Sequence, residues 1–262
     1  MRTPSGRGWP IAGSVAVVLL SPLLAVLTGF TWAYTLAVLG LFLLFWALTR
    51  LAGHQLGLRW GDRRSYIAGL AYPMAVMGPL MLIGFAFGAG ERGMARWNWL
   101  ALELGTVFAA TALGALLTEE AFFRGWLWGV LKREGQRTTI VLVWTSAVFM
   151  SWHLPIAVME TEFALPAAIV PLYLANILFI GLNWGMMRLR SGSILVPSLS
   201  HGLWNALAYT FFGYGTRMGE LGISSYAIID PERGWLGLVL NIGVFALLWR
   251  WWGHRSARTS PV

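Results

Sequence analysis

The stretch from Gly8 to Thr49 decides the class of fold, and it reads GWPIAGSVAVVLLSPLLAVLTGFTWAYTLAVLGLFLLFWALT. These 42 residues contain no charged side chain. A helix needs about 20 predominantly apolar residues to cross the hydrocarbon core of a bilayer, so the stretch is long enough for two crossings. No small-residue cleavage pattern leads from it into a polar mature chain. It therefore predicts a pair of transmembrane helices that is retained at the N-terminus.

The composition of the whole chain excludes a soluble fold. Of its 262 residues, 57% are apolar and only 11% are charged, which is too few to cover the surface of a domain in water. The formal net charge of +8 would suit a nucleic-acid partner in a soluble chain. Here the basic residues lie mostly between apolar runs, so we expect no nucleic acid among the partners. The absence of cysteine removes disulfides, thiolate catalysis and cysteine-bound zinc.

Eight apolar segments divide the chain and predict an all-α, polytopic membrane protein with about eight transmembrane helices. No repeat or separate soluble domain interrupts them, so residues 1–262 are expected to form a single membrane domain. The expected spans are 9–28, 31–50, 66–89, 98–131, 138–159, 164–187, 194–213 and 235–252. The fourth span is long, about 51 Å at ~1.5 Å per residue against a hydrocarbon core of ~30 Å. It must tilt, project or break, and Gly125 and Gly129 are the expected break points.

The basic residues fall mainly on one side of this arrangement. If the N-terminus is cytoplasmic, the fourteen basic residues on the cytoplasmic side are Arg2, Arg7, Arg50, Arg59, Arg63, Arg64, Lys132, Arg133, Arg137, Arg188, Arg190, Arg250, Arg255 and Arg258. The four on the outer side are Arg92, Arg96, Arg217 and Arg233. The positive-inside rule therefore places both termini in the cytoplasm. We expect a multi-pass protein of the bacterial cytoplasmic membrane, with the lipid bilayer as a partner.

Ionisable residues inside the fourth span form the first functional motif, Glu119-Glu120-Ala121-Phe122-Phe123-Arg124. Helical spacing of four places Glu120 and Arg124 on one face, where they can form an ion pair. Glu119 points about 100° away, at ~3.6 residues per turn. It is thereby left without a local partner and is a candidate general base.

Two further motifs place histidines inside apolar spans. They are Phe149-Met150-Ser151-Trp152-His153 and His201-Gly202-Leu203-Trp204-Asn205. A lone intramembrane histidine is often only a packing residue. Measured from the cytoplasmic boundary at ~1.5 Å per residue, however, Glu119 lies ~18 Å deep, His153 ~22 Å, and His201 with Asn205 ~10 to 17 Å. Similar depths predict that the three motifs meet in one site.

A carboxylate, two imidazoles and a carboxamide suit hydrolysis. Glu119 and His153 could polarise and deprotonate a water, while His201 and Asn205 donate hydrogen bonds to the oxyanion. Glu119, His153 and His201 could instead bind Zn²⁺ and leave one position open for water. The residues alone leave both chemistries open.

The runs EEAFFRGWLWG, FMSWH and GMMRLRSGSILVPSLSHGLWN resemble the CAAX protease and bacteriocin-processing family of intramembrane endopeptidases, also called the Abi family. The order and spacing match its Glu-Glu-x-x-x-Arg, Phe-x-x-x-His and His-x-x-x-Asn motifs, within a catalytic core of about 98–213. The resemblance implies catalytic roles for Glu119, His153, His201 and Asn205, with Glu120 and Arg124 in support. It also implies a peptide or protein substrate, which is prenylated in the eukaryotic Ras-converting branch. The glutamate mechanism proposed for that branch favours the metal-free chemistry, so no cofactor is expected, and zinc is the alternative.

Two other classes of function remain open on the sequence. Buried Glu, His and Arg also mark transporters and proton relays, and a non-catalytic membrane scaffold could keep these residues for helix pairing. The endopeptidase hypothesis expects a cavity that admits a peptide from the cytoplasmic side. No internal repeat supports a transporter, so the endopeptidase is the favoured function.

The predicted topology can be tested by cysteine labelling, because the chain has no native cysteine. Single cysteines at Ser65 and Ser224 should react with a membrane-impermeant thiol reagent from opposite sides of the membrane. Ser65 should be reached from the cytoplasm, beside the basic residues Arg63 and Arg64. Labelling of both positions from the same side would rule out the eight-span arrangement.

Overall fold

The computed structural model describes residues 8–30, 32–87, 97–159, 162–215, 217–223 and 226–256. Several charges that enter the predicted topology lie outside the described residues, namely Arg2, Arg7, Glu91, Arg92, Arg96, Glu160 and Arg258. The elements in order are α1 (Trp9–Thr28), α2 (Trp32–Thr49), α3 (Gly53–Leu56), α4 (Arg63–Ala86), α5 (Trp97–Leu117), the π-helix η1 (Glu120–Leu127), α6 (Trp128–Arg133), α7 (Thr138–Val158), α8 (Val170–Ser191), α9 (Leu195–Leu207), the π-helix η2 (Ala208–Phe212), β1 (Gly213–Tyr214), β2 (Arg217–Met218), α10 (Tyr226–Ile229) and α11 (Trp235–Ser256).

The fold is all-α and multi-pass, as predicted. Within the described residues, six helices are long and apolar enough to cross a bilayer: α1, α2, α4, the run Trp99–Arg133, α7 and α8. A shorter apolar helix, Trp235–Trp251, lies within α11. The predicted span 194–213 corresponds to α9 and η2. Each predicted span thus has a helical counterpart, and six of them meet the length and hydropathy that a crossing requires.

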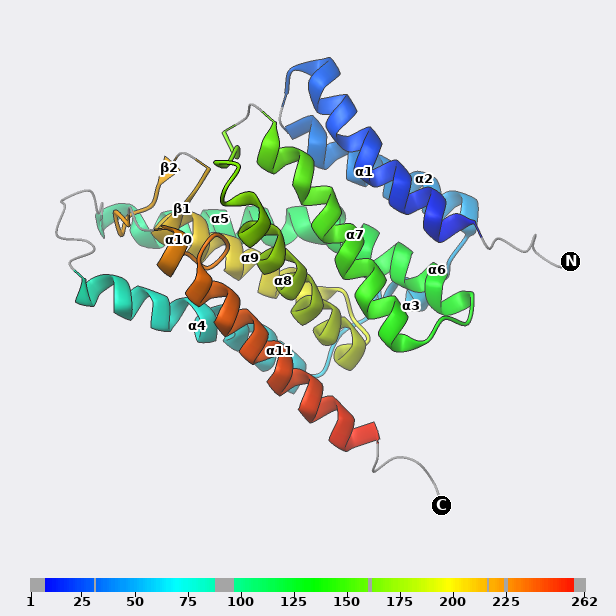
Figure 1. Cartoon of the computed structure of the whole chain (residues 1–262). Coiled ribbons are helices and arrows are strands. Elements are labelled where there is room, and N and C mark those ends of the chain that lie inside the picture. Colours follow the sequence, from blue (N-terminus) through cyan, green and yellow to red (C-terminus); the bar gives the residue numbers. More distant parts are fainter. Residues whose placement is uncertain are drawn as a thin grey trace, which may run out of the picture.

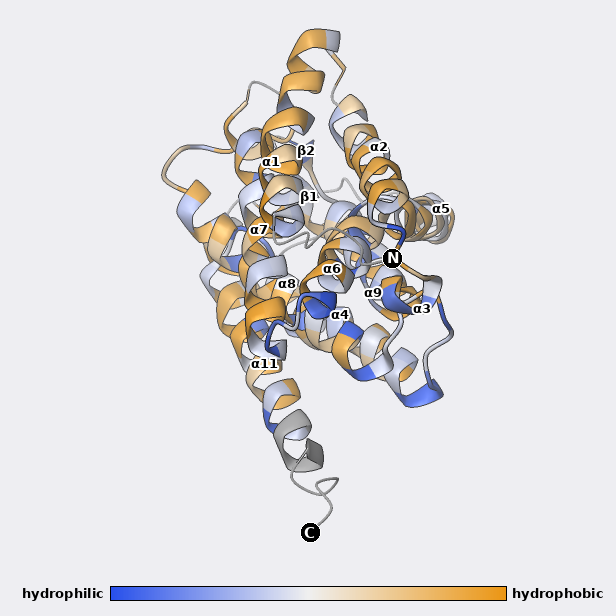
Figure 2. Cartoon of the chain, turned by 90° about the vertical axis from the view of Figure 1, so that its right-hand side faces the viewer, coloured by the Kyte–Doolittle hydropathy of each residue, from blue (hydrophilic) through white to orange (hydrophobic). Residues whose placement is uncertain are grey.

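The outside of the bundle is apolar. Leu27 is 73% exposed and Leu82 is 71% exposed, and Figure 2 shows hydrophobic residues along α1 and α2. Apolar side chains presented outward on this scale would be unfavourable in water, whereas lipid tails solvate them. The two ends of the bundle differ: α3 and α6 lie at one end, and β1, β2 and α10 lie at the opposite end (Figure 1).

Glycines allow the central helices to pack closely. A Cβ on Gly202 of α9 would lie 2.5 Å from the Cβ of Ala112 on α5, and one on Gly185 of α8 would lie 2.4 Å from Leu142 Cδ1 on α7. Since real Cβ atoms do not approach so closely, a larger residue at Gly202 would have to push the helices apart, whereas at Gly185 the Leu142 side chain would have to move. Gly202 directly follows His201, so the contact between α5 and α9 also fixes the depth of that histidine.

The long fourth span does not break at Gly125 or Gly129, contrary to the sequence prediction. It continues to Arg133, with the segment Glu120–Leu127 widened into a π-helix. The two glycines serve close packing instead: a Cβ on Gly129 would lie 3.0 Å from the Gln55 carbonyl oxygen, and one on Gly125 would lie 3.4 Å from the Leu56 carbonyl oxygen. The prediction failed because these glycines accommodate the backbone of α3, a contact that the sequence does not reveal.

A buried arginine of α8 supports the π-helix. The Nε of Arg188 donates a hydrogen bond to the carbonyl oxygen of Arg124 at 3.0 Å, and its Nη2 donates to the carbonyl of Gln55 at 3.2 Å. A π-helix is rare and is found mostly as a single turn near functional sites. Arg188 thus ties α8, α3 and η1 together beside the motif that carries Glu119 and Glu120.

The packing of α5 against α9 predicts a sharp difference between two glycine substitutions. Gly202→Ala should lower the free energy of unfolding by about 1–3 kcal/mol, because the added methyl overpacks the contact with Ala112. Gly114→Ala on α5 is the matched control, since nothing lies within 4 Å of its Cβ position. Thermal unfolding in detergent measures both variants. Equal melting temperatures for the two would contradict the close approach of α5 and α9.

Candidate active site

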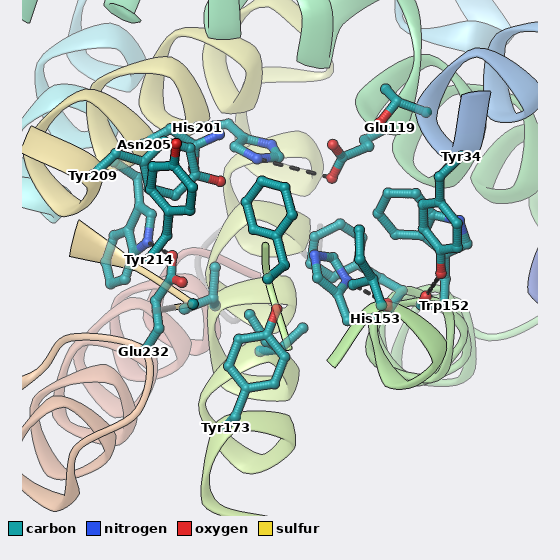
Figure 3. Close-up of a pocket in the computed structure, with 18 of the residues that line it drawn as sticks. Tyr34, Glu119, Trp152, His153, Tyr173, His201, Asn205, Tyr209, Tyr214 and Glu232 are labelled. Atoms are coloured by element: carbon teal, nitrogen blue, oxygen red, sulfur yellow. Dashed lines mark hydrogen bonds and ion pairs between the residues drawn. The ribbon is translucent and has the colours of Figure 1, made fainter. Parts of the chain in front are cut away.

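A cavity of about 350 Å³ contains all four residues that the sequence predicts as catalytic. Glu119 lies at the junction of α5 and η1, His153 lies on α7, and His201 and Asn205 lie on α9. The structure therefore brings side chains from three separate helical segments to one place. Figure 3 shows them around the cavity, with Glu119 and His201 facing each other.

The predicted ion pair between Glu120 and Arg124 is present. The Nη1 of Arg124 lies 3.0 Å from the Oε1 of Glu120, and both side chains are completely buried. Arg124 also donates from Nη2 to the carbonyl oxygen of Gly181 on α8 at 3.1 Å. Arg124 thereby joins the π-helix to α8. Its charge is neutralised by Glu120 of the same helix, as a charge inside the membrane requires.

Glu120 has a second partner that the sequence did not reveal. The same oxygen, Oε1, lies 3.1 Å from the Nδ1 of His201 on α9. A carboxylate oxygen accepts, so Nδ1 donates, and the hydrogen bond fixes the orientation of the imidazole. Glu120 is therefore both the counter-charge of Arg124 and the group that aims His201 into the cavity.

Glu119 faces the other nitrogen of the same imidazole. Its Oε2 lies 3.8 Å from the Nε2 of His201, beyond hydrogen-bond distance. That oxygen has no hydrogen-bond partner among the described residues. The Glu119 side chain keeps 15% of its surface exposed, whereas that of Glu120 keeps none. Of the two adjacent glutamates, Glu119 is the one that faces the cavity.

The environment of His201 determines which hydrogen bonds it can make. Its ring stacks on the indole of Trp184 at a centroid distance of 4.0 Å and an interplanar angle of 19°, and Trp184 donates from Nε1 to Ser200 Oγ at 3.2 Å. Because Nδ1 donates to Glu120, a neutral ring leaves Nε2 as an acceptor. Nε2 donates only when both nitrogens carry protons, and the two flanking carboxylates compensate the charge of that form.

His153 has a defined tautomer. Its Nδ1 lies 2.9 Å from the carbonyl oxygen of Phe149, and a carbonyl only accepts, so Nδ1 carries the hydrogen. In the neutral ring, Nε2 is therefore the acceptor. The backbone around His153 is held from α2, because the hydroxyl of Tyr34 donates to the carbonyl oxygen of Trp152.

Phe149 connects the three motifs. Its ring packs against His153 at a centroid distance of 4.5 Å and against His201 at 6.4 Å. The guanidinium carbon of Arg124 lies 4.3 Å from its centroid, which is within cation–π range. The phenylalanine of the second motif thus packs against Arg124 and against both histidines, and it keeps their spacing fixed.

Asn205 lies one helical turn beyond His201, on the same wall of the cavity (Figure 3). Its carboxamide forms no hydrogen bond with the described part of the chain, unlike the buried Asn176, Asn183 and Asn241. An unoccupied amide donor in a polar cavity can serve a ligand.

The alternative zinc site is not assembled by these side chains. Among the described residues, no three His, Asp or Glu side chains form a group that could hold a metal ion. The nitrogen Nδ1 of His201 is engaged by Glu120, and that of His153 by the carbonyl oxygen of Phe149. These contacts leave Nε2 of each ring as the nitrogen that can meet a ligand, as in a metal-bound histidine.

The sequence missed a second set of lining residues, which follow η2 or lie near the ends of helices. Tyr173, Tyr209, Tyr214 and Glu232 line the cavity, and Trp204 donates from Nε1 to the Oε1 of Glu232 at 2.7 Å. Loss of water around the carboxyl, together with the nearby Asp230 charge, raises the pKa of Glu232 to about 6. The segment from Gly213 to Gly234 carries no motif, so only its position in space identifies it.

The cavity lies toward the end of the bundle that carries β1 and β2. Two connecting segments contribute to its wall, the link between α7 and α8 and the stretch between η2 and α11. Phe163 comes from the first, and Gly215 and Glu232 come from the second. None of the lining residues comes from the α2–α4, α6–α7 or α8–α9 connections, which lie beside nine of the fourteen basic residues assigned to the cytoplasmic side. If the N-terminus is cytoplasmic, the cavity therefore lies toward the outer side of the membrane. The sequence predicted both a cytoplasmic N-terminus and access of the substrate from the cytoplasm, and these two predictions disagree.

The region that holds these motifs resembles known peptidases. Residues 99–207 match the family model described as type II CAAX prenyl endopeptidase Rce1-like. No curated protein and no solved structure matched the chain. The matched region runs from α5 to α9 and contains the three motifs. Over residues 99–207, the chain is thus similar to the CAAX protease family.

Proposed function

We propose that this chain is an intramembrane endopeptidase that hydrolyses a peptide bond of a membrane-associated substrate, either CAAX-like or another peptide. The observation that carries the proposal is the convergence of Glu119, His153, His201 and Asn205 around one cavity. This convergence lies within the region that matches the CAAX protease family. Three helical segments supply these four side chains. Polar residues that served only helix packing would not need to meet in one place.

Glu119 and His153 are suited to activate water. Glu119 presents Oε2 without a hydrogen-bond partner among the described residues, so that oxygen can accept a proton from water. His153 presents the acceptor Nε2 to the same cavity and can hold the second hydrogen of that water. The water oxygen then bonds to the carbonyl carbon of the scissile peptide, and its proton passes to Glu119.

His201 and Asn205 are suited to stabilise the resulting oxyanion. Asn205 donates from its amide, and His201 donates from Nε2 when both ring nitrogens carry protons. Because Glu120 already neutralises Arg124, the charge of the imidazolium is balanced by Glu119 before the attack and by the oxyanion after it. Glu119 then returns the proton to the leaving nitrogen. The C–N bond breaks, and a carboxylic acid and an amine are released.

The other classes of function explain less of the geometry. A charge pathway would use the buried ionisable groups, but Arg124 is completely buried, is paired with Glu120 and lies outside the cavity wall. A scaffold would gain nothing from a buried glutamate oxygen that has no hydrogen bond within the described residues. Substitutions of Glu119 and Asn205 distinguish both alternatives from the enzyme.

We further propose eight membrane crossings with both termini in the cytoplasm, for which the basic residues provide the support. In that orientation the cavity lies toward the outer side, because Glu232 and its neighbours belong to an outer connection. The substrate would then reach Glu119 from outside the cytoplasm, which replaces the cytoplasmic access expected from the sequence. Labelling of a cysteine at Ser224, in the same connection, tests the side directly.

Glu119→Gln and Glu120→Gln should separate the two glutamate roles. Glu119→Gln keeps the side-chain volume and removes the base, so cleavage of a fluorogenic peptide library should fall by at least ~10² with little change in melting temperature. Glu120→Gln leaves the buried Arg124 without a counter-charge, so stability should fall by about 3–5 kcal/mol together with activity.

The double variant Glu120→Gln/Arg124→Met provides the control for this pair. It removes the stranded charge and should recover part of the lost stability relative to Glu120→Gln. The role assignment is reversed if Glu120→Gln is stable and inactive while Glu119→Gln keeps full activity.

Asn205→Ala should lower kcat by ~10² to 10³ and change KM much less, because an oxyanion donor acts in the transition state. The melting temperature should stay unchanged, since the Asn205 carboxamide has no hydrogen bond to lose within the described structure. Steady-state kinetics on one cleaved library peptide give both constants. A raised KM with unchanged kcat would instead make Asn205 a ground-state binding residue.

A further inference from the structure

The short segment between α10 and α11 is held rigidly. Asp230 Oδ1 accepts hydrogen bonds from the backbone nitrogens of Glu232 and Arg233, both at 2.8 Å. Arg233 donates from Nε to Asp230 Oδ2 at 3.0 Å and from its Nη atoms to the carbonyls of Phe212, Gly213 and Gly215. The charges of Asp230 and Arg233 therefore balance each other, and the pair fixes the backbone on both sides of Glu232.

A network of buried amides fixes the same segment from the helices. Asn241 of α11 donates from Nδ2 to the carbonyl of Pro231 at 3.3 Å and to Asn176 Oδ1 at 3.1 Å. Asn176 donates to the carbonyl of Gly234 at 3.3 Å, and Tyr72 donates to Asn241 Oδ1 at 2.6 Å. Both asparagines are completely buried. Such a network is costly unless every member is satisfied, and it confers rigidity when it is.

The side chain that this scaffold presents to the cavity is Glu232. Its Oε1 accepts the indole hydrogen of Trp204, the neighbour of Asn205. Its Oε2 accepts no hydrogen bond from any described residue. The residue is half-buried, and the proposed hydrolysis does not use it. Glu232 is therefore an acceptor that faces the cavity with one oxygen available.

The surroundings of Glu232 suit a cation. The rings of Tyr173, Tyr209 and Tyr214 line the same cavity, as do the carboxylates of Glu119 and Glu162. Arg233 also reaches the wall, but its charge is engaged by Asp230. A wall of carboxylates and aromatic rings attracts an ammonium or guanidinium group through charge-assisted hydrogen bonds and cation–π contacts.

We propose that Glu232, with Tyr173, Tyr209 and Tyr214, forms an acidic subsite that binds the Lys or Arg side chain of a peptide substrate. The subsite lies beside Asn205, so it would hold a basic residue close to the bond that is cleaved. This proposal rests on the proposed endopeptidase function. The proposal extends that function by naming the chemical group of the substrate that the cavity would select.

Glu232→Gln tests the subsite, because glutamine keeps the acceptor for Trp204 and removes only the charge. The substrates are pairs of fluorogenic peptides that differ at one position, with Lys or Arg in one and norleucine in the other. In the wild type, kcat/KM should favour the basic peptide. In Glu232→Gln the ratio of the two kcat/KM values should fall at least ~10-fold, mainly through KM.

The matched control is Asp62→Asn. Asp62 caps the N-terminus of α4, outside the cavity wall, and accepts a hydrogen bond from the backbone nitrogen of Ser65 at 3.1 Å. The substitution changes the net charge of the protein equally, asparagine keeps the cap, and the ratio should stay as in the wild type. If Glu232 serves only to hold Trp204, Glu232→Gln should leave the ratio unchanged, and that result overturns the proposal.

The pH dependence of the same ratio is a second readout. Because the pKa of Glu232 is raised to about 6, the preference for the basic peptide should grow between about pH 5 and about pH 7 as the carboxyl ionises. Asp230, Arg233 and His201 also act on Glu232. Effects of these groups on catalysis itself cancel in the ratio. A wild-type ratio that stays flat over this range counts against the subsite.

Binding separates failure of the subsite from failure of the endopeptidase function. Fluorescence anisotropy of the same labelled peptides is measured on Glu119→Gln and on Glu119→Gln/Glu232→Gln. Basic peptides should bind the first variant at least ~10-fold more tightly than neutral ones, and the second should lose that difference. If nothing is cleaved but this pattern is seen, the hydrolysis is wrong and the subsite stands. Equal binding of both peptides to Glu119→Gln overturns the subsite.

Discussion

The Glu120 carboxylate, buried inside the membrane bundle, holds the site together. One of its oxygens receives Arg124 from its own helix and His201 from α9. A charge at this depth is costly unless it is paired and hydrogen-bonded, so the three groups depend on one another. Their arrangement determines where α9 meets η1 and which nitrogen of His201 faces the cavity. Glu119, one residue earlier, is left with an oxygen that no described residue engages.

The packing around this charge explains why unusual local structure is stable. The π-helix widens the chain where Glu120 and Arg124 turn inward, and Arg188 bonds to one of its carbonyls. Gly125 and Gly129 admit the backbone of α3 on the other side. Phe149 lies over the guanidinium of Arg124. Helices from distant parts of the sequence thus meet on one short segment, and small residues are needed wherever two backbones approach.

The cavity extends beyond the region that matches the CAAX protease family. Residues 99–207 contain the three motifs, but Tyr34 and Glu232 come from outside that region and also form the wall. The residues of the proposed hydrolysis and most of those of the proposed acidic subsite are therefore provided by different parts of the chain.

The sequence by itself determined the class of fold and the pairing within each motif. Apolar runs predicted membrane helices because the bilayer demands length and hydropathy, and a spacing of four predicted the pair Glu120–Arg124 because one helical turn fixes it. The resemblance indicated which side chains belong to the site. Only the tertiary structure showed that Glu120 orients His201, that Gly129 packs rather than breaks the helix, and that Glu232 reaches the cavity. These contacts join elements far apart in the chain, and local periodicity carries no information about which helices will touch.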